Sequence, residues 1–448
     1  MAAAASEKSV TERLIERLER PIAAADRRRA ALHLVDWIGC AVIGRTVEAG
    51  RILAAEARGT GSVPLFGGDS ADPAGAAFSL GALGSLYEMD DVHRTALLHP
   101  GPVVIPAALA AAPDAAAGAA LLDAMILGYE AMIRIGRAVG PGHYAFFHNT
   151  STCGGFGAAA AAGHLVGLDR ASLASALGNA GSLSGGLWQC RNEAVMTKTL
   201  HCAEGARRGV TAARLAANGF TGPRLILEGP QGFFAALCPG ADPEHVLAED
   251  DDWLIFDTSF KPWPACRHAH AAIDATLLLR EEIGTTPIEA IAIETFADAK
   301  LFCDRPTPLT SHQAKFSLQH AVAVTLTSGA PPLSAFDLPA LTRPDLVALR
   351  DIATVTATAD FTDRYPRHFG SAVTVTLADG RTLSRRVADA LGDSENPVAE
   401  EALFDKARML MTAAGLAPNV AEDLILAALS LAEGAPLSDL RRAMSAAR

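Results

Sequence analysis

The spacing of apolar residues divides this chain into two kinds of sequence. Up to about residue 265, apolar residues recur at the three- and four-residue intervals of α-helices, as at Leu32, Val35, Ile38 and Val42. This part is rich in alanine and other good helix formers, and Gly/Pro pairs separate the apolar segments. Five further segments share this character: 107–112, 115–127, 156–165, 171–180 and 203–217. We therefore expect this part of the chain to be helical.

Near residue 285 the spacing changes to the alternation that is typical of β-strands. Segments 288–296 and 351–359 alternate and contain β-branched residues. Segment 372–377 also alternates, and Asp379-Gly380 separates it from 382–387, which predicts a hairpin with an Asp-Gly turn. After Pro397 the helical spacing returns.

These patterns predict a mainly α fold with two domains. Residues 1–266 and 396–448 are expected to form a large all-helical domain, and residues 267–395 a smaller α+β domain inserted in it. The joint near Pro262 and Pro264 is the expected hinge, and clefts between domains are favoured ligand sites.

Composition excludes several classes of protein. Half of the 448 residues are hydrophobic, which excludes a disordered chain, and the net charge of −12 argues against nucleic acid or an anionic membrane as partner. No stretch is apolar enough for a membrane span, and charges near the N-terminus argue against an export signal. The seven cysteines form no CxxC pair, which fits reduced thiols, so we expect a cytoplasmic protein.

One short segment concentrates acids and imidazoles ahead of Pro100-Gly101. It contains Glu88, Asp90, Asp91, His93 and His99. Neighbouring acids and imidazoles shift each other's pKa values and can divide the roles of general acid and base. A solvated loop with capping carboxylates is an equal alternative. A metal site is the less favoured alternative, because no second cluster has metal-ligand spacing, and we expect no metal.

A second segment places His148 just before a Gly/Ala-rich helix. One hydroxyl among residues 150–152 is expected to cap this helix, whose free N–H groups and dipole favour an anion. His148 is either part of such a site or an ordinary core histidine. The pattern Gly155-x-Gly157-x-x-Ala160 is similar to a dinucleotide fingerprint, but no strand precedes it, so we reject that interpretation.

Two segments offer positive charge. Lys198 lies in a weakly charged stretch, where a partly buried lysine either pairs with an acid or acts as a base; a surface lysine is the alternative. Lys261 and Arg267, at the domain joint, are suited to clamp carboxylates.

Three further side chains at the joint are of types that bind metals or act as nucleophiles. Cys266, His268 and His270 suggest a metal or a thiol nucleophile, but the adjacent helix start favours a structural role for both histidines.

Taken in order along the chain, these segments resemble the MmgE/PrpD family. The family's His-x-Leu-Asp-x-Asp-Asp-Thr-His loop corresponds to residues 85–93, and its His-Pro to His99-Pro100. Further matches lie at 128–138, 148–150, 197–201, 219–223, 228–229 and 261–267. The resemblance implies a helical domain with an α+β lid, a homodimer and no organic cofactor. Known activities of the family include 2-methylcitrate dehydratase, cis-aconitate decarboxylase and iminodisuccinate epimerase.

The resemblance also implies the composition of the site. The residues expected to be catalytic are Asp91, His99, Tyr144, His148 and Lys198, and those expected to bind substrate are Asp90, Arg191, Lys261, Arg267 and His320. Ser85, Glu88 and Val92 depart from the family's His, Asp and Thr, and His320 stands where Tyr is common. A substrate different from those of standard members is therefore expected.

The chemistry implied is removal of a proton from carbon next to a carboxylate. His148, Lys198 and Tyr144 are the candidates for the base, and His99, supported by Asp90 or Asp91, would return a proton or protonate a leaving hydroxyl. We expect a cofactor-independent lyase or dehydratase similar to 2-methylcitrate dehydratase, acting on a small anionic di- or tricarboxylate. The alternatives are an epimerase of a dicarboxylate such as iminodisuccinate and a catalytically silent binding protein of the same fold.

Overall fold

The computed structural model describes residues 8–56, 61–193 and 195–448. Internal contacts divide the chain into two compact units, each with its own hydrophobic core. The large unit comprises Met1–Leu86, Asp90–Thr258 and Glu400–Arg448. The small unit comprises Tyr87–Met89 and Ser259–Ala399.

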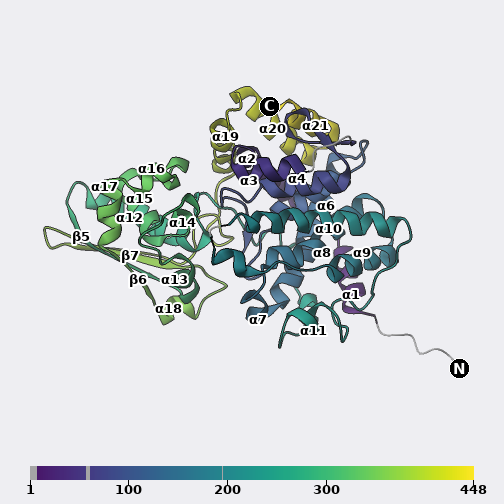
Figure 1. Cartoon of the computed structure of the whole chain (residues 1–448), viewed down its shortest axis with the longest axis horizontal. Coiled ribbons are helices and arrows are strands. Elements are labelled where there is room, and N and C mark those ends of the chain that lie inside the picture. The colour runs from purple at the N-terminus through teal and green to yellow at the C-terminus, as the bar shows by residue number, and fades with distance from the viewer. Residues whose placement is uncertain (1–7, 57–60, 194) are drawn as a thin grey trace. The chain divides into compact units, whose positions relative to one another are not determined.

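The large unit is built almost entirely from helices (Figure 1). They are α1 (Val10–Leu18), α2 (Ala24–Gly44), α3 (Glu48–Glu56), α4 (Pro73–Leu83), α5 (Gly101–Ala111), α6 (Gly118–Ala138), α7 (Gly140–Tyr144), α8 (Asn149–Leu165), α9 (Arg170–Ser182), α10 (Thr197–Ala217), α11 (Phe233–Leu237), α19 (Glu400–Ala413), α20 (Pro418–Ser430) and α21 (Leu437–Ala446). Short strands are β1 (Val63–Pro64) and β2 (Ser70–Ala71), which pair antiparallel, and β3 (Val92–His93); β4 (Thr258–Ser259) is where the chain enters the small unit.

Helix α8 forms the centre of the large unit's core. It packs against α5, α6, α9 and α10. Its alanines 158–162 are all buried, and such small side chains let neighbouring helices approach closely. Both ends of α8 therefore lie at fixed positions, which matters because His148 directly precedes it.

A buried ion pair joins the C-terminal segment to the N-terminal part of the large unit. Helix α19 packs along α2, and Lys406 Nζ donates to Asp36 Oδ1 at 2.6 Å. Both side chains are at most 5% exposed. Burial raises the pKa of Asp36 to about 6, although the charge of Lys406 opposes this shift.

The small unit is organised around a four-stranded sheet with strand order β6-β5-β7-β8. The strands are β5 (Ile288–Thr295), β6 (Ala353–Ala357), β7 (Ser371–Leu377) and β8 (Thr382–Val387). Strand β5 pairs parallel with β6 and antiparallel with β7, which pairs antiparallel with β8. The helices are α12 (His270–Ile283), α13 (Ala297–Cys303), α14 (Ser311–Lys315), α15 (Leu318–Ser328), α16 (Leu338–Leu341), α17 (Pro344–Asp351) and α18 (Ala359–Thr362). Helix α12 packs against β7, β8 and α15 (Figure 1).

The strands expected from alternation are confirmed. Segment 288–296 forms β5 and segment 351–359 contains β6. The Asp-Gly hairpin joins β7 to β8, with Thr376 opposite Thr382. Gly380 in its turn has a φ of +86°, a conformation that glycine adopts without strain.

Among the described residues, no single helix is both long and apolar enough to cross a membrane. Helices α2 and α3 pass that test of length and composition only as a pair, and they are bent by 99° at their junction.

Buried histidines predict a loss of stability in mild acid. Burial lowers the pKa of His33 to about 4, of His93 to about 3 and of His320 to about 4. An imidazole in the unfolded chain titrates near 6.5, so as pH falls the unfolded chain takes up protons first. The stability that these neutral histidines contribute is fully present above about pH 6.5 and is lost as pH falls toward about 4. Asp36, with its raised pKa, opposes the trend as a single group.

Thermal melting on either side of this pH window checks the prediction. The midpoint temperature is expected to be lower on the acid side. A midpoint that stays constant or rises as pH falls through the window would contradict the assignment of neutral buried histidines.

Candidate active site

The loop before α5 is fixed by the buried carboxylate of Asp91. Tyr129 Oη donates to Asp91 Oδ2 at 2.6 Å, and the Gly101 N–H donates to Oδ1 at 2.9 Å. His33 Nδ1 lies 2.9 Å from Oδ2 and, because this imidazole is neutral, carries its proton there. A Cβ on residue 101 would lie 2.7 Å from Oδ1, so this close approach requires glycine. Asp91 thereby ties its loop to α2, α5 and α6.

His99 is held by the same loop. Its Nδ1 lies 2.7 Å from the carbonyl oxygen of Asp91 and 3.0 Å from Oδ2 of Asp90, so Nδ1–H is the donor. Its side chain is 17% exposed, and among the described residues no hydrogen-bond partner holds Nε2. Asp90 and His99 form an acid–imidazole pair in which the protein holds the ring through Nδ1.

Helix α8 begins before the hydroxyl residues that were expected to cap it. Its first residue is Asn149, His148 is the residue before it, and no side chain caps it. The prediction that a hydroxyl among residues 150–152 caps the helix is therefore wrong. Thr150 Oγ1 instead accepts a hydrogen bond at 3.0 Å from the backbone N–H of His99, which links the loop to this helix.

A short antiparallel contact positions His148 beside Trp188. The His148 N–H donates to the Gly186 carbonyl oxygen, and the Trp188 N–H donates to that of Phe146, both at 2.9 Å. Gly186 has a φ of +123°, and a Cβ there would lie 2.5 Å from Ser151 Cβ, so glycine is required. The rings of His148 and Trp188 lie 4.3 Å apart.

His148 and His201 form a neutral imidazole pair. Their Nδ1 atoms lie 3.1 Å apart, so one donates and the other accepts. Burial lowers the pKa of His148 well below 6.5, and the positive charge of Lys198 lowers it further, whereas Asp90 opposes the shift. Burial, together with Arg208 and Lys198, lowers the pKa of His201 to about 4. Both rings therefore stay neutral at pH 7.

Lys198 stands in the first turn of α10 and is half-buried. It precedes His201 by three residues, so both side chains project from the same face of the helix. Its positive charge acts on both histidines of the pair.

Trp188, in the short helix η2 (Trp188–Arg191), contacts two more predicted residues. The Tyr144 ring meets it edge-on at 6.0 Å, and the Arg191 guanidinium lies 5.5 Å from its ring.

The large unit thus carries seven of the ten residues predicted for the site, linked through the contacts above. They are Asp90, Asp91, His99, Tyr144, His148, Arg191 and Lys198. The other three lie in the small unit, where they make separate contacts.

Lys261 is fully buried. Its Nζ donates to the carbonyl oxygen of Glu88 at 3.2 Å and lies 3.7 Å from the Glu88 carboxylate. Glu88 has a φ of +58°, which is unusual for a residue with a side chain. It is followed by Met89 and then by Asp90 of the candidate site.

Arg267 and His320 hold the interior of the small unit together. Arg267 pairs with Asp393 and donates to the carbonyl oxygens of Phe260, Ala390 and Leu391. Binding a substrate carboxylate at Arg267 would require breaking this buried network. His320 is likewise fully buried, with Nε2 2.8 Å from the Ala335 carbonyl oxygen and Nδ1 3.0 Å from Arg350. These contacts favour a packing role for His320.

Two groups of side chains among the described residues lie close enough to share a metal ion. They are Cys266, His268 and Cys303, and His368, Asp389 and Glu395. Neither group includes a residue of the loop that carries Asp90 and His99.

His201 and Trp188 were missed from the sequence as members of the candidate site. The i, i+3 spacing of Lys198 and His201 on one predicted helix was a usable signal. Trp188 offered no comparable signal, because its ring reaches His148 through backbone pairing between distant segments.

Asp91→Asn is expected to destabilise the large unit by about 2–4 kcal/mol, because an amide nitrogen would replace an acceptor that faces buried donors. The control Asp251→Asn changes an exposed carboxylate and should stay within about 0.5 kcal/mol of the parent protein. Urea unfolding measures both variants. Equal stability of the two variants would contradict the anchoring role of Asp91.

Comparisons with known proteins show the family of this chain. The MmgE/PrpD N-terminal domain matches residues 18–246, and the MmgE/PrpD C-terminal domain matches residues 263–431. The chain is 27% identical to cis-aconitate decarboxylase of Homo sapiens over 422 residues, covering 89% of this chain and 84% of that protein. It is 26% identical to cis-aconitate decarboxylase of Aspergillus terreus, in a match that covers 92% of this chain and 91% of that protein. The chain is also 29% identical to cis-aconitate decarboxylase of Mus musculus over 277 residues. That match covers 58% of this chain and 55% of the relative, so it spans about half of the relative's length. The chain belongs to the MmgE/PrpD family.

Proposed function

We propose that this protein is a lyase that generates a carbanion next to a carboxylate of a small di- or tricarboxylate. The observation that carries the proposal is that the Asp90–His99 pair and Lys198 both act electrostatically on His148, which forms a neutral pair with His201. The relatives named as cis-aconitate decarboxylases support a lyase rather than an epimerase.

Decarboxylation and dehydration make the same demands on such a site. In decarboxylation the electrons of the broken C–C bond stay on carbon as CO₂ leaves, and a proton must then reach that carbon. In dehydration a proton leaves the same kind of carbon before hydroxide departs. Both routes place negative charge on carbon next to a carboxylate, so both need a fixed cation and a group that transfers a proton.

We assign proton transfer to Nε2 of His99. Its Nδ1–H is held by Asp90 Oδ2 and by the Asp91 carbonyl oxygen, so a charge gained at Nε2 is stabilised by the Asp90 carboxylate. Lys198 supplies the positive charge that stabilises the carbanion and its adjacent carboxylate. His148 stays uncharged and offers a hydrogen bond without taking the proton. Asp91 acts as a positioning residue, because donors from three helices occupy its carboxylate.

Tyr144 and Arg191 are proposed to bind a distal carboxylate of the substrate, because Trp188 holds both near His148. Lys261 already has the Glu88 carboxylate beside it. A lysine with a protein carboxylate for a neighbour attracts a substrate carboxylate less strongly.

Lys198→Met is expected to lower kcat by about 10²–10⁴ with the fold intact, because the cation acts as charge develops in the transition state. Steady-state kinetics with the best substrate of a di- and tricarboxylate panel measure this. The matched control is Lys300→Met, an exposed lysine of α13, which should leave kcat unchanged. A loss confined to KM would mean that Lys198 only anchors a carboxylate.

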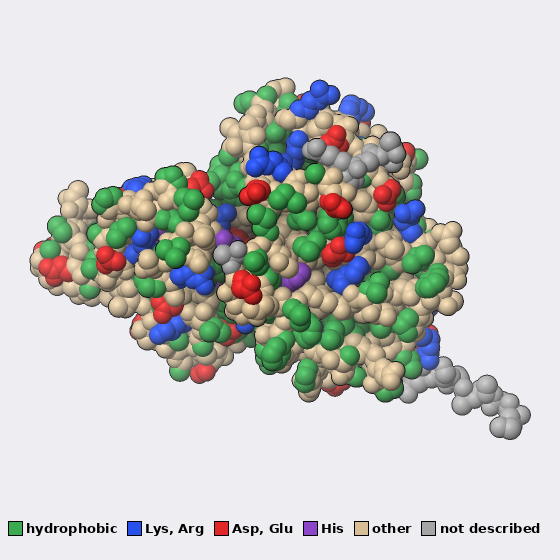
Figure 2. Space-filling model, viewed as in Figure 1, with side chains coloured by type: hydrophobic (Ala, Val, Ile, Leu, Met, Phe, Trp, Pro, Cys, Tyr) green, Lys and Arg blue, Asp and Glu red, His purple; other side chains and the backbone are tan. Residues whose placement is uncertain are grey.

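We also propose that the chain forms a homodimer through the face of the large unit that carries α10. Six large apolar side chains around α9 and α10 are between 37% and 65% exposed: Leu183, Leu187, Met196, Leu200, Leu215 and Phe220. Leu183, Leu200 and Leu215 line a groove of about 650 Å³. Figure 2 shows hydrophobic side chains among acidic and basic ones over this face. Exposed apolar patches of this kind mark protein interfaces.

Sedimentation analysis tests the dimer. The parent chain is expected at twice its chain mass, and Leu183→Asp with Leu215→Asp should give a folded monomer. The control Leu278→Asp alters a leucine that is 57% exposed in α12 of the small unit and should stay dimeric. A monomeric parent chain would rule out the proposal.

A further inference from the structure

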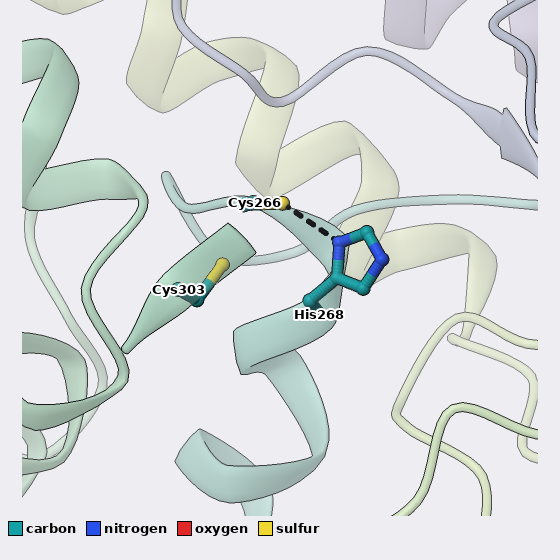
Figure 3. A group of neighbouring side chains, drawn as sticks. All are labelled: Cys266, His268 and Cys303. Carbon is teal, nitrogen blue, oxygen red and sulfur yellow. Dashed lines mark hydrogen bonds between the residues drawn. The ribbon is translucent and has the colours of Figure 1, made fainter. Parts of the chain in front are cut away.

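The small unit holds a buried cluster of two thiols and one imidazole, Cys266, His268 and Cys303 (Figure 3). Cys266 precedes the short helix η4 (Arg267–Ala269), which contains His268, and Cys303 is the last residue of α13. The three side chains are 7%, 8% and 0% exposed. The cluster joins a Cys-x-His pair on one segment to a cysteine 35 positions after His268 in the sequence.

Geometry brings the donor atoms of all three residues together. One ligand atom from each residue lies within 4.8 Å of the other two, and Cys266 Sγ lies 3.1 Å from His268 Nδ1. Figure 3 shows both sulfur atoms on the side of the imidazole that bears Nδ1. Two sulfurs and one ring nitrogen therefore surround one point.

The imidazole is held in this orientation by packing. Rings of Phe296, Phe302 and Phe369 lie between 5.3 and 5.4 Å from the His268 ring, two of them stacked on it. Within the described part of the chain, His268 Nε2 is buried and has no hydrogen-bond partner. Aromatic packing thus holds the plane of the ring, and the contact with Cys266 shows that Nδ1 is the nitrogen that faces the sulfurs.

We propose that Cys266 Sγ, His268 Nδ1 and Cys303 Sγ form a binding site for a thiophilic metal ion of the Zn²⁺ class. Thiolate and imidazole ligands select zinc and related soft or borderline ions over magnesium or calcium, which prefer oxygen. Three protein ligands leave a fourth position of a tetrahedral zinc ion for water or another donor.

Binding is balanced in charge and protons. A divalent ion held by two thiolates and a neutral imidazole has no net charge, which suits a buried location. Each thiol that binds as a thiolate releases its proton to solvent, so affinity rises with pH. Ideal zinc–ligand distances of about 2.0–2.3 Å place tetrahedral ligands about 3.5–3.8 Å apart. Cys266 Sγ and His268 Nδ1 must therefore separate by about half an ångström, as their hydrogen bond is replaced by two bonds to the metal.

Titration of the reduced full-length chain with Co²⁺ tests this site. We expect one Co²⁺ per chain, with a thiolate-to-cobalt charge-transfer band and the intense d–d bands of four-coordinate cobalt, both abolished by one equivalent of Zn²⁺. Cys266→Ser and Cys303→Ser should each weaken Co²⁺ binding at least about tenfold and reduce the charge-transfer band. Cys40→Ala is the matched control, because it removes a buried cysteine of α2 outside both metal-capable groups and should leave the spectrum unchanged.

The parent chain alone can overturn the proposal, whether or not the serine variants fold. Absence of a thiolate-to-cobalt band at stoichiometric Co²⁺ would overturn it, and so would an unchanged band in folded Cys266→Ser and Cys303→Ser chains. Saturating Zn²⁺ should also raise the melting temperature of the parent chain by several degrees, because the ion binds the folded state preferentially. The same Zn²⁺ should slow the alkylation of Cys266 and Cys303 relative to the zinc-free chain and leave that of Cys190 unchanged, and rates that Zn²⁺ does not change at all three would overturn the site.

Discussion

The buried carboxylate of Asp91 is the interaction on which the candidate site depends. It accepts hydrogen bonds from His33, Tyr129 and Gly101, which belong to α2, α6 and α5. A buried charge is tolerated only when donors surround it, and here the donors come from three helices of the core. The backbone of the same residue accepts from His99. Removing the charge would therefore release both the loop and the imidazole.

Close helix packing determines the protonation state of the histidines in the candidate site. The alanine-rich helix α8 carries His148 at its start, and dense packing excludes water from this ring. Desolvation and nearby positive charges keep His148 and His201 neutral. His99 retains some exposure and has an acidic partner, so it is the imidazole suited to exchange protons. Three histidines within one unit thereby differ in their burial and in their partners.

Local patterns in the sequence predicted the elements that depend on neighbouring residues. Alternation and the Asp-Gly turn predicted β5, β6 and the β7–β8 hairpin, since hydrogen bonding and side-chain period are local properties there. The order of motifs predicted the family, and the family models confirm it. The acid and imidazole residues of the candidate site stay a prediction.

Contacts between segments that are distant in the sequence could not be predicted from such patterns. Tyr87–Met89 belongs to the small unit because Lys315 and Lys261 donate to the carbonyl oxygens of Tyr87 and Glu88, across more than 170 positions of sequence. The guanidinium group of Arg267 is suited to bind a substrate carboxylate. Asp393, 126 positions away in the sequence, already accepts a hydrogen bond from it. His201 joins His148 only because α10 packs on α8. Sequence spacing identifies reactive residue types, whereas packing decides which of them meet a substrate.

The central claim is that His99, supported by Asp90, transfers a proton at carbon next to a substrate carboxylate. Proton NMR of a di- and tricarboxylate panel incubated in D₂O measures this step directly. The claim predicts that one substrate loses CO₂ or water with deuterium exchanged at that carbon, and that His99→Gln abolishes both the exchange and the product. Product formed at an undiminished rate by His99→Gln would contradict it.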